Sequence, residues 1–424
     1  MKKMKAIVIY EPGGPEKLLL EERPIPELRE GWTLVKVRGF GINHSEIFTR
    51  QGLSPSVSFP RILGIECVGQ VAETTRTDLE IGQKVVSIMG EMGRAYDGSY
   101  AEYVLLPNDQ VYPVETSLSW AELAAVPETY YTALGSLKNL HIKPEDKILV
   151  RAATSGVGLA FARLVKAQFP DVHIVGSVRS GSKQFLLKHQ AYDDIVIDQD
   201  GRLETEEQFD KILELVGPST IKDSFDHIAP GGIICVTGLL GGQWELEGFN
   251  PIEEIKNNSF MTTFHSAQVN QELMDELFDY IDRYQVDVSP RRVFFLEEVP
   301  EAHAYIEGKT GFGKVVIINE NNRRSMMKKI SAKELQGLLQ TEKIELIDVR
   351  EVDEFANGHV AGARNLPLSG LAENYLSLDK EISYHVICQK GGRSARACEF
   401  LEAKGYQVTN VEGGVEAYPD ELTQ

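Results

Sequence analysis

The sequence lacks long apolar runs, paired cysteines and an excess of positive charge, and each absence excludes a class of protein. No stretch has the length of a membrane-spanning helix, and the basic residues at the start precede a short strand at 6–10 rather than the apolar run of an export signal. Four cysteines without paired or metal-finger spacing indicate a reducing compartment, so we expect a cytoplasmic location. A net charge of -19 at pH 7 disfavours nucleic acid and anionic membranes as partners.

In its composition and length, the chain is typical of a globular protein with more than one domain. Hydrophobic residues make up 42% and charged residues 25%, and 424 residues suffice for two or three domains. The first third shows short strands at 33–37, 67–72, 84–89 and 101–106, separated by Gly and Pro. From about Glu122 onward, strands alternate with helices, which predicts a parallel sheet with crossover helices and an α/β fold class.

Near the C-terminus a cysteine stands between a strand and a helix. Cys388 follows the apolar residues 384–387, and we expect a helix at 395–401. The loop between them consists of Gln389, Lys390, Gly391, Gly392, Arg393 and Ser394. Converging backbone N–H groups, the helix dipole and the neighbouring cations lower the pKa of such a thiol, and Ser394 is expected to N-cap the helix. The pattern therefore predicts a reactive thiolate.

The spacing within this loop narrows its chemistry. Four residues separate Cys388 from Arg393, one fewer than in cysteine phosphatases, whose wider loop surrounds a tetrahedral phosphate. Cys388, Gly391, Arg393 and Ser394 match the Cys-x-x-Gly-x-Arg-Ser loop of the rhodanese family, which residues 330–424 resemble throughout. Other recurrent segments of that family are matched at 348–350, 354–355, 358–360, 362–367 and 413–418, with Tyr418 where tryptophan is more frequent.

The rhodanese resemblance implies a small α/β domain that transfers sulfur. Cys388 takes sulfane sulfur from a donor, holds it as a persulfide stabilised by the N–H groups of 389–394 and by Arg393, and passes it to a thiol or to cyanide. Two alternatives stay open: a persulfide sensor or binding module without turnover, and a small phosphatase, which the short loop disfavours. The residues expected to have only structural roles are Asp348, Arg350, His359 and Cys398.

A turn of small residues between a strand at 148–151 and a helix at 158–168 predicts a nucleotide site. The turn consists of Ala153, Thr154, Ser155, Gly156, Val157 and Gly158. Its small side chains let the backbone approach a pyrophosphate at the helix N-terminus. Ala153 and Ser155 replace the first two glycines of the usual fingerprint, whereas Gly158 keeps the third.

The end of the next strand bears on the choice of cofactor. Where NAD-binding proteins have an acidic residue for the ribose, this chain has Ser177, Arg179, Ser180 and Lys183. A basic loop with hydroxyl groups suits the 2′-phosphate of NADPH, so we expect NADPH as the cofactor. The alternative is a solvated loop that binds nothing.

Residues 1 to about 320 resemble the zinc-free quinone oxidoreductase branch of the medium-chain dehydrogenase/reductase superfamily. The matching segments are 4–6, 13–15, 41–46, 50–52, 64–66, Gly69, 153–160 and 313–316. The resemblance implies a GroES-like β-rich catalytic domain (1–122 and 265–320), a Rossmann doubly wound parallel sheet (123–264), a linker (321–329) before the rhodanese-like domain, and a homodimer. The residues that it places along the nicotinamide cleft are Asn43, Tyr131, Thr132, Gly238, Leu239 and Lys314.

The sequence departs from the zinc-dependent members of that superfamily at the metal ligands. Asn43 and Ile65 stand in place of a cysteine and a histidine, and Glu128 falls near the third ligand position. Residues 89–100 contain no cysteine for a structural metal lobe. An amide and an alkyl side chain do not build a tetrahedral zinc site, so we expect no metal.

Without a Lewis acid, hydride transfer requires an acceptor that takes hydride readily. We therefore expect a quinone as the substrate, or an α,β-unsaturated carbonyl as in an enoyl or alkenal reductase. Tyr131 or His44 is a candidate proton donor, and the sequence does not choose between them. Core packing of Tyr130 and Tyr131 is the alternative for the tyrosine pair, and a structural role is the alternative for His44.

Overall fold

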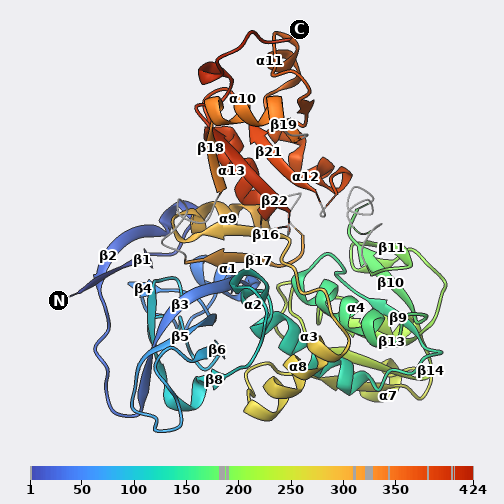
Figure 1. The fold of residues 1–424 in the computed structure, drawn as a ribbon. Coiled ribbons are helices and arrows are strands. Elements are labelled where there is room, and N and C mark those ends of the chain that lie inside the picture. Colours follow the sequence, from blue (N-terminus) through green and yellow to red (C-terminus); the bar gives the residue numbers. More distant parts are fainter. Residues whose placement is uncertain are drawn as a thin grey trace. The chain divides into compact units, whose positions relative to one another are not determined.

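The computed structural model of the protein describes residues 2–180, 187, 191–308, 312–319, 328–341, 344–379, 382–402, 404 and 406–423 (Figure 1). The chain forms two compact units, Met1–Asn319 and Glu320–Gln424. Each unit has hydrophobic core clusters of its own. The finer predicted boundaries within the first unit, after residues 122 and 264, stay predictions. Among the described residues, no helix combines the length and apolar character needed to cross a membrane.

A largely antiparallel sheet forms the β-rich part of the first unit. Its strand order is β16-β17-β3-β5-β6-β8, and β7 also pairs with β3. A smaller sheet has the order β2-β1-β4. The strand bounds are β1 Lys3–Ile9, β2 Leu19–Pro24, β3 Trp32–Ile42, β4 Arg61–Ile62, β5 Glu66–Thr74, β6 Lys84–Ile88, β7 Tyr103–Pro107, β8 Tyr112–Pro113, β16 Arg292–Phe295 and β17 Val315–Ile318. The helices of this part are α1 His44–Arg50, α2 Trp120–Ala124 and α9 Val299–Glu307, and α3 Pro127–Leu140 follows.

The Rossmann part of the unit is a sheet with the order β12-β11-β10-β9-β13-β14-β15, parallel except for β12. Apolar strand residues are buried on both faces, as expected for a parallel sheet covered by helices. The bounds are β9 Lys147–Val150, α4 Gly156–Gln168, β10 His173–Val178, β11 Asp194–Gln199, β12 Arg202–Leu203, β13 Phe209–Glu214, α6 Ile221–Asp226, β14 Ile228–Val236, α7 Pro251–Glu254, β15 Phe260–Thr263 and α8 Gln271–Arg283. The predicted helix at 183–189 lies outside the described residues, apart from Leu187.

The second unit is a parallel sheet with the order β18-β22-β21-β19-β20 and a hydrophobic cluster on each face. The bounds are β18 Lys328–Ser331, α10 Ala332–Thr341, β19 Glu345–Asp348, α11 Val352–Ala356, β20 Arg364–Asn365, α12 Leu371–Asn374, β21 Ser383–Ile387, α13 Gly392–Glu402 and β22 Gln407–Glu412. Two predictions need correction here. Lys328 and Lys329, assigned to the linker, instead pair with β22, while 321–327 lie outside the described residues. Ser394 is not an N-cap, because α13 begins at Gly392.

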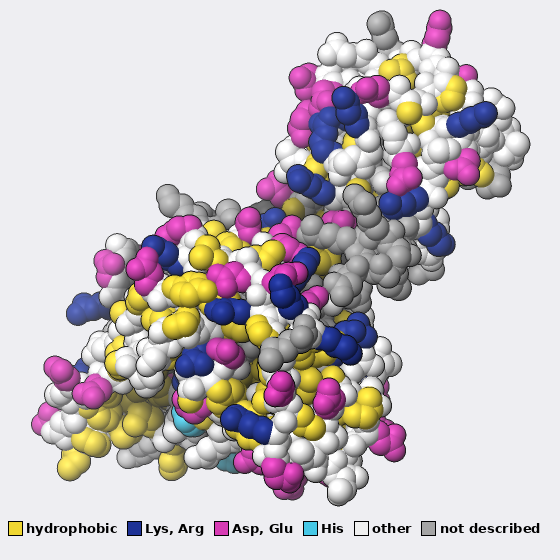
Figure 2. Space-filling model, turned by 90° about the vertical axis from the view of Figure 1, so that its left-hand side faces the viewer, with side chains coloured by type: hydrophobic (Ala, Val, Ile, Leu, Met, Phe, Trp, Pro, Cys, Tyr) yellow, Lys and Arg dark blue, Asp and Glu magenta, His cyan; other side chains and the backbone are white. Residues whose placement is uncertain are grey.

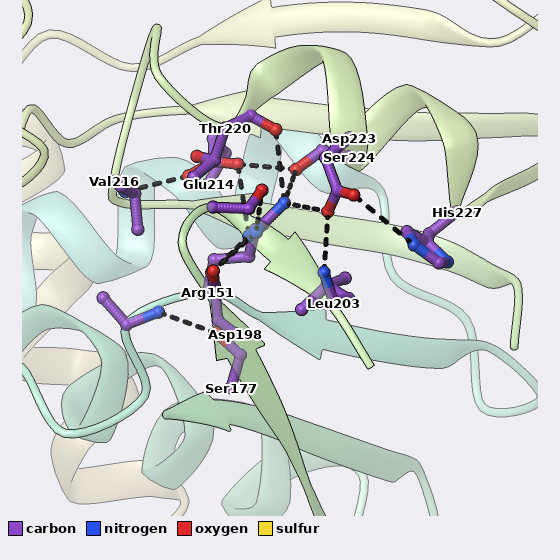
Figure 3. A network of polar contacts seen from close by, with 12 residues as sticks. Arg151, Ser177, Asp198, Leu203, Glu214, Val216, Thr220, Asp223, Ser224 and His227 are labelled. Carbon is purple, nitrogen blue, oxygen red and sulfur yellow. Dashed lines mark hydrogen bonds and ion pairs between the residues drawn. The ribbon is translucent and has the colours of Figure 1, made fainter. Parts of the chain in front are cut away.

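A buried arginine holds together the edge of the Rossmann sheet that carries the predicted nucleotide turn. Arg151 directly follows β9 and is 0% exposed. Its guanidinium donates to Asp198 at 2.6 Å and to Asp223 at 2.8 Å, and Nε lies 3.8 Å from Glu214 (Figure 3). It also donates to Ser224 and to the carbonyls of residues 201 and 220. These partners come from β11, β13 and α6, so one side chain ties three elements to the end of β9.

Charge balance explains why this arginine stays ionised in the interior. Burial by itself lowers the pKa of Arg151, but Glu214, Asp198 and Asp223 more than offset that effect and raise it. Glu214 in turn accepts hydrogen bonds from the N–H groups of Val216 and Gly217 and from Ser224. Each buried charge therefore has several partners, which is the condition for keeping charges in a protein core.

Replacing Arg151 with methionine is expected to destabilise the first unit by about 3–5 kcal/mol, because buried carboxylates would lose their cation. Chemical unfolding followed by tryptophan fluorescence measures this, since all three tryptophans, Trp32, Trp120 and Trp244, lie in that unit. Arg202→Met is the control, because Arg202 is exposed nearby on β12 and should change stability by less than about 0.5 kcal/mol. Equal stability of the two variants would contradict the expectation.

Candidate functional site

The turn between β9 and α4 has the geometry of an anion site. Ser155 N-caps α4, its hydroxyl accepting from the N–H of Gly158 at 3.1 Å. The first-turn N–H groups of Gly156 and Val157 are then left to bind an anion. Ala152 adopts a left-handed conformation, with φ of 59°, which turns the chain from strand to helix. A Cβ on Gly158 would lie 3.0 Å from the carbonyl oxygen of Ala152, a tight contact, so glycine is favoured here for close packing of helix and strand.

Ser177 and Tyr192 hold the turn in position through hydrogen bonds to its backbone. Ser177, buried at the end of β10, accepts from the N–H of Ala152 at 3.2 Å, and its carbonyl accepts from Ala153 at 3.1 Å. Tyr192 donates to the carbonyl of Ala153 at 3.0 Å. The hydroxyl of Ser177 is thus engaged with the backbone, and its observed role is to position the turn.

The other predicted cofactor residues divide into three groups. Arg179 and Ser180 are exposed just after β10, where a 2′-phosphate is expected. Gly238 and Leu239 follow β14 and lie against Gly217. Lys183 lies outside the described residues.

Lys314 connects the nucleotide turn to the predicted nicotinamide cleft. The N–H of Gly313 donates to the carbonyl of Thr154 at 2.8 Å, which places Lys314 beside the turn. Its Nζ donates to Glu66 Oε1 at 2.5 Å and to Asn43 Oδ1 at 2.7 Å. Asn43 also donates to Glu66 Oε1 at 2.8 Å. The three side chains form a closed triangle of hydrogen bonds, which we call the Lys314 triangle.

Two further glutamates border the Lys314 triangle. Glu66 Oε2 accepts from the N–H of Glu128 at 2.9 Å. Burial raises the pKa of Glu128, while the charge of Lys314 opposes the shift. Burial, and secondly the charge of Glu66, raise the pKa of Glu46 to about 8. The site therefore combines the Lys314–Glu66 ion pair with two carboxyl groups, Glu128 and Glu46, whose pKa burial raises.

The positions at which zinc-dependent members of the superfamily have metal ligands make other contacts here. Asn43 is committed to Lys314 and Glu66, and Ile65 contributes its backbone N–H to Glu46 at 3.5 Å. Among the described residues, no three His, Cys, Asp or Glu side chains are grouped so as to hold a metal ion. The predicted absence of zinc stays a prediction, because the described residues are only part of the chain.

The contacts of Tyr131 favour the packing alternative over proton donation. Tyr131 is 0% exposed, its hydroxyl donates to the carbonyl of Gln268 at 3.2 Å and accepts from the N–H of Asn270 at 3.2 Å. Thr132 is buried beside it and donates to Glu128 at 3.2 Å. His44, the other candidate donor, is exposed at the start of α1.

In the second unit, the loop after β21 surrounds the sulfur of Cys388 with donors. The N–H of Gly391 lies 3.2 Å from Sγ, and the hydroxyl of Ser394 donates to Sγ at 3.4 Å. Burial works against ionisation, but the hydrogen bonds of Ser394 and the backbone N–H groups of Lys390 and Gly391 outweigh it and lower the pKa of Cys388. The predicted reactive thiolate is thus supported mainly by hydrogen bonds.

The cations of the loop are paired with carboxylates. Arg393 donates to both oxygens of Glu354, at 2.5 and 2.6 Å, and this pairing lowers the pKa of Glu354 to about 2. The side chain of Lys390 is 75% exposed and lies 3.5 Å from Glu416. From the sequence, both cations were expected to act on the thiolate, and the loop itself does not indicate their carboxylate partners. The Glu354-Phe355 match to the rhodanese family was the available indication for Glu354.

The residues expected to hold the loop are found in supporting positions. Arg350 donates to Asp348 at 2.7 Å and to the carbonyl of Gly358 at 2.8 Å, and it reaches Gln389 at 3.4 Å. Cys398 belongs to one of the two core clusters of this unit, which also contains Cys388. Burial raises the pKa of Cys67, Cys235 and Cys398, so Cys388 differs from the other three cysteines.

Family models match three segments of the chain. The alcohol dehydrogenase GroES-like domain matches residues 29–116, the zinc-binding dehydrogenase domain 189–317, and the rhodanese-like domain 331–421. The first two lie in the first unit and the third in the second.

Similar proteins match about three quarters of the chain. A quinone oxidoreductase from Pongo abelii is 27% identical over 342 residues, covering 75% of this chain and 98% of that protein. A synaptic vesicle membrane protein VAT-1 homolog from Danio rerio is 24% identical over 349 residues, covering 74% and 70%. The structure of a quinone oxidoreductase from Coxiella burnetii has a TM-score of 0.65 at 26% identity, covering 75% and 100%. A mycobacterial protein complexed with NADPH shares the fold, with a TM-score of 0.63 at 23% identity, covering 74% and 99%.

Replacing Ser394 with alanine is expected to raise the pKa of Cys388 by about one to two units, the loss of one hydrogen bond to a charged group. Alkylation by iodoacetamide as a function of pH measures the change, and the other three cysteines, whose pKa burial raises, should stay unreactive in the folded protein. Ser369→Ala is the control, because Ser369 is bonded to Glu351 instead. A profile of Ser394→Ala that coincides with wild type would contradict the assigned role.

Proposed function

Since the chain joins a medium-chain dehydrogenase/reductase of the quinone oxidoreductase type to a C-terminal rhodanese-like domain, we propose that it carries out two reactions. The first is NADPH-dependent, zinc-independent reduction of a quinone or an α,β-unsaturated carbonyl. The second is transfer of sulfane sulfur through a persulfide on Cys388. The observation that carries the first is the Lys314 triangle beside the nucleotide turn, and the second rests on the donor-lined thiol.

Binding of NADPH is assigned to the β9–α4 turn and to the loop after β10. The N–H groups of Gly156 and Val157 bind the pyrophosphate, and Arg179 with Ser180 bind the 2′-phosphate. When bound, the cofactor supplies a hydride. The chain's own groups then orient the acceptor and stabilise the negative charge that develops on it. Lys314 is the cation placed for that task, and Glu66 and Asn43 hold its Nζ in position.

Zinc independence is proposed because both polar atoms of the Asn43 amide already have hydrogen-bond partners in the Lys314 triangle. Its oxygen accepts from Lys314 and its nitrogen donates to Glu66. A fixed ammonium group then takes the place of a Lewis acid. An ammonium polarises a carbonyl less strongly than a metal, which favours acceptors that are already activated, such as quinones and enones.

Sulfur transfer by Cys388 follows from attack by its thiolate. The thiolate forms a bond to the outer sulfur of a donor such as thiosulfate, the sulfur–sulfur bond of the donor breaks, and sulfite leaves with the electron pair. The N–H groups of the loop and the hydroxyl of Ser394 stabilise the resulting persulfide anion. Cyanide or a thiol then attacks the outer sulfur, and Cys388 returns as thiolate.

We also propose that the protein is a homodimer located in the cytoplasm. Strand β15 is the last strand of its sheet and exposes Phe260 and Met261, and Ile252 of α7 is 92% exposed. An apolar sheet edge of this kind is suited to pairing with a second copy, and a monomeric mass in analytical ultracentrifugation would contradict the proposed homodimer.

All four cysteines are free, which fits a reducing compartment such as the cytoplasm. Lys and Arg side chains are interspersed with Asp and Glu on the face shown in Figure 2, which supports the absence of a nucleic-acid footprint there.

The purified protein is expected to oxidise NADPH in the presence of quinones or enones, after treatment with a chelator as well as before it. Comparing the rate of NADPH oxidation with quinones and with enones shows which of the two acceptor classes the protein reduces. NADPH should be preferred to NADH, and Arg179→Ala should reduce that preference by about tenfold, the loss of one charge-assisted hydrogen bond. No NADPH oxidation with any acceptor would refute the reductase proposal.

The second reaction is tested by thiosulfate and cyanide with the wild type and Cys388→Ser. Thiocyanate should form with the wild type and not with the variant, while NADPH oxidation should be equal in both. Cys398→Ser is the matched control, because it makes the same substitution at a thiol whose pKa burial raises. If the wild type forms a persulfide on Cys388 but no thiocyanate, the C-terminal unit is a sensor or binding module. The observation that favours this second candidate is the exposed side chain of Lys390, which pairs with Glu416 and not with the thiolate.

A further inference from the structure

Trp244 lies in the loop after β14, residues 237–250, and contacts a helix from the β-rich part of the same unit. It is 55% exposed. Its ring meets the ring of Phe48 on α1 edge to face, with centroids 5.6 Å apart and an interplanar angle of 75°. The ring of His44, one turn earlier on α1, lies 6.5 Å from that of Phe48. We call the contact between Trp244 and Phe48 the aromatic bridge.

On the α1 side, the aromatic bridge is connected to the Lys314 triangle. Asn43 is the N-cap of α1, and its Oδ1 accepts from Lys314 at 2.7 Å. Gly313, the residue before Lys314, donates to the carbonyl of Thr154 in the nucleotide turn. About one turn of helix therefore separates Phe48 from the predicted position of the nicotinamide.

On the other side, the aromatic bridge is connected to the ends of the Rossmann strands. The N–H of Gly241 donates to the carbonyl of Val216, just after β13, at 2.8 Å. The end of β9 is bonded to β13 in turn, because the N–H of Arg151 donates to the carbonyl of Leu213 at 3.0 Å. The bridge thus closes a ring of contacts around the carboxyl ends of β9, β13 and β14.

This ring surrounds the place where a dinucleotide binds to a sheet of this kind, outside the carboxyl ends of its strands. In the proposed binding mode, the pyrophosphate lies at the β9–α4 turn and the nicotinamide beside Lys314 and Asn43. A contact from the loop after β14 to α1 then crosses the nicotinamide half of the cofactor.

The segment that carries Trp244 lies between two glycines suited to act as hinges. Gly242 and Gly248 have φ of 71° and 60°, and a Cβ on either would meet nothing within 4 Å. Glycine adopts these left-handed angles without strain, and small residues of this kind often absorb the backbone rotation at a hinge. Between them, the hydrogen bond from Gln243 to the carbonyl of Glu245 stays within the segment.

Given the NADPH binding proposed above, we propose that the aromatic bridge is a gate over the nicotinamide half of the dinucleotide site. The gate opens when residues 243–247 move about Gly242 and Gly248, and the cofactor then enters or leaves. Between these events it is closed, in the free as in the bound protein. The strength of the contact between Trp244 and Phe48 therefore adds to the barriers of binding and of release, and it cancels in Kd.

The test measures binding and release of NADPH by the full-length protein, using stopped-flow fluorescence. In Trp244→Ala, the rate constants of binding and of release should both rise by about threefold to tenfold, the factor that corresponds to the strength of one aromatic pair. Because the two increases are equal, Kd should keep its wild-type value. Trp244→Phe retains an aromatic ring and should exchange the cofactor nearly as slowly as the wild type.

Phe48→Ala removes the other half of the aromatic bridge and should give the same increases. The double variant with Trp244→Ala should exchange NADPH no faster than either single variant, because both remove one contact. Glu247→Gln is the control, since Glu247 is exposed in the same segment. It should leave both rate constants unchanged at high salt, where the lost charge has little effect.

A second measurement needs no cofactor. The tryptophan emission of Phe48→Ala should lie at longer wavelength than that of the wild type, because the indole of Trp244 becomes more exposed. The shift should disappear when Trp244 is replaced with phenylalanine as well.

Unchanged rate constants in Trp244→Ala would overturn the gate. A higher Kd that comes from faster release alone would also overturn it, and would make Trp244 a direct contact of the cofactor. A wild type that binds NADPH but oxidises it with no acceptor would refute the proposed reductase, and the binding kinetics would still decide the gate. A wild type that binds no dinucleotide would refute both.

Discussion

The ion pair between Lys314 and Glu66 is the contact on which the proposed reductase site depends. Lys314 precedes β17 of the β-rich sheet, Glu66 begins β5 of the same sheet, and the residue before Lys314 is bonded to the nucleotide turn. A buried carboxylate without its cation would be costly, so this pair fixes the side chain of Lys314 on the β-rich sheet, and the hydrogen bond from Gly313 to Thr154 links the same segment to the turn after β9. The same pair also fixes Asn43. The geometry of the Lys314 triangle and its position beside the turn after β9 therefore depend on a few neighbouring contacts.

Both candidate sites share a construction that is based on backbone rather than on side-chain charge. In each, a parallel strand ends, a short turn follows, and a helix begins with its N–H groups directed at the ligand position. Side-chain charges near the two sites are mostly paired: Lys314 with Glu66, and Arg393 with Glu354. Fixed dipoles remain for the incoming anion, and they need no reorganisation when it binds.

Local patterns in the sequence were sufficient for the elements and turns. The apolar strand before Ala153, the helix after Ser155 and the strand before Cys388 are set by residues adjacent in the chain, and each was predicted within a few residues. Contacts between distant segments were not accessible in this way. Tyr131 is buried against Gln268 and Asn270, more than a hundred residues away, and no local pattern distinguishes that role from proton donation. Glu46 and Arg50, on a short helix, resemble solvated charges until their burial is seen.

The left-handed alanine at residue 152 has a consequence for affinity. A non-glycine residue in this region costs of the order of 1 kcal/mol, a cost that the surrounding bonds of Arg151, Ser177 and Tyr192 meet during folding. The turn is thus already shaped before any ligand arrives. Binding then loses little conformational entropy in ordering the loop, and more of the interaction free energy appears as affinity. In this chain, the rigidity of the nucleotide turn is a property that the fold supplies in advance, in place of the flexibility that a glycine would bring.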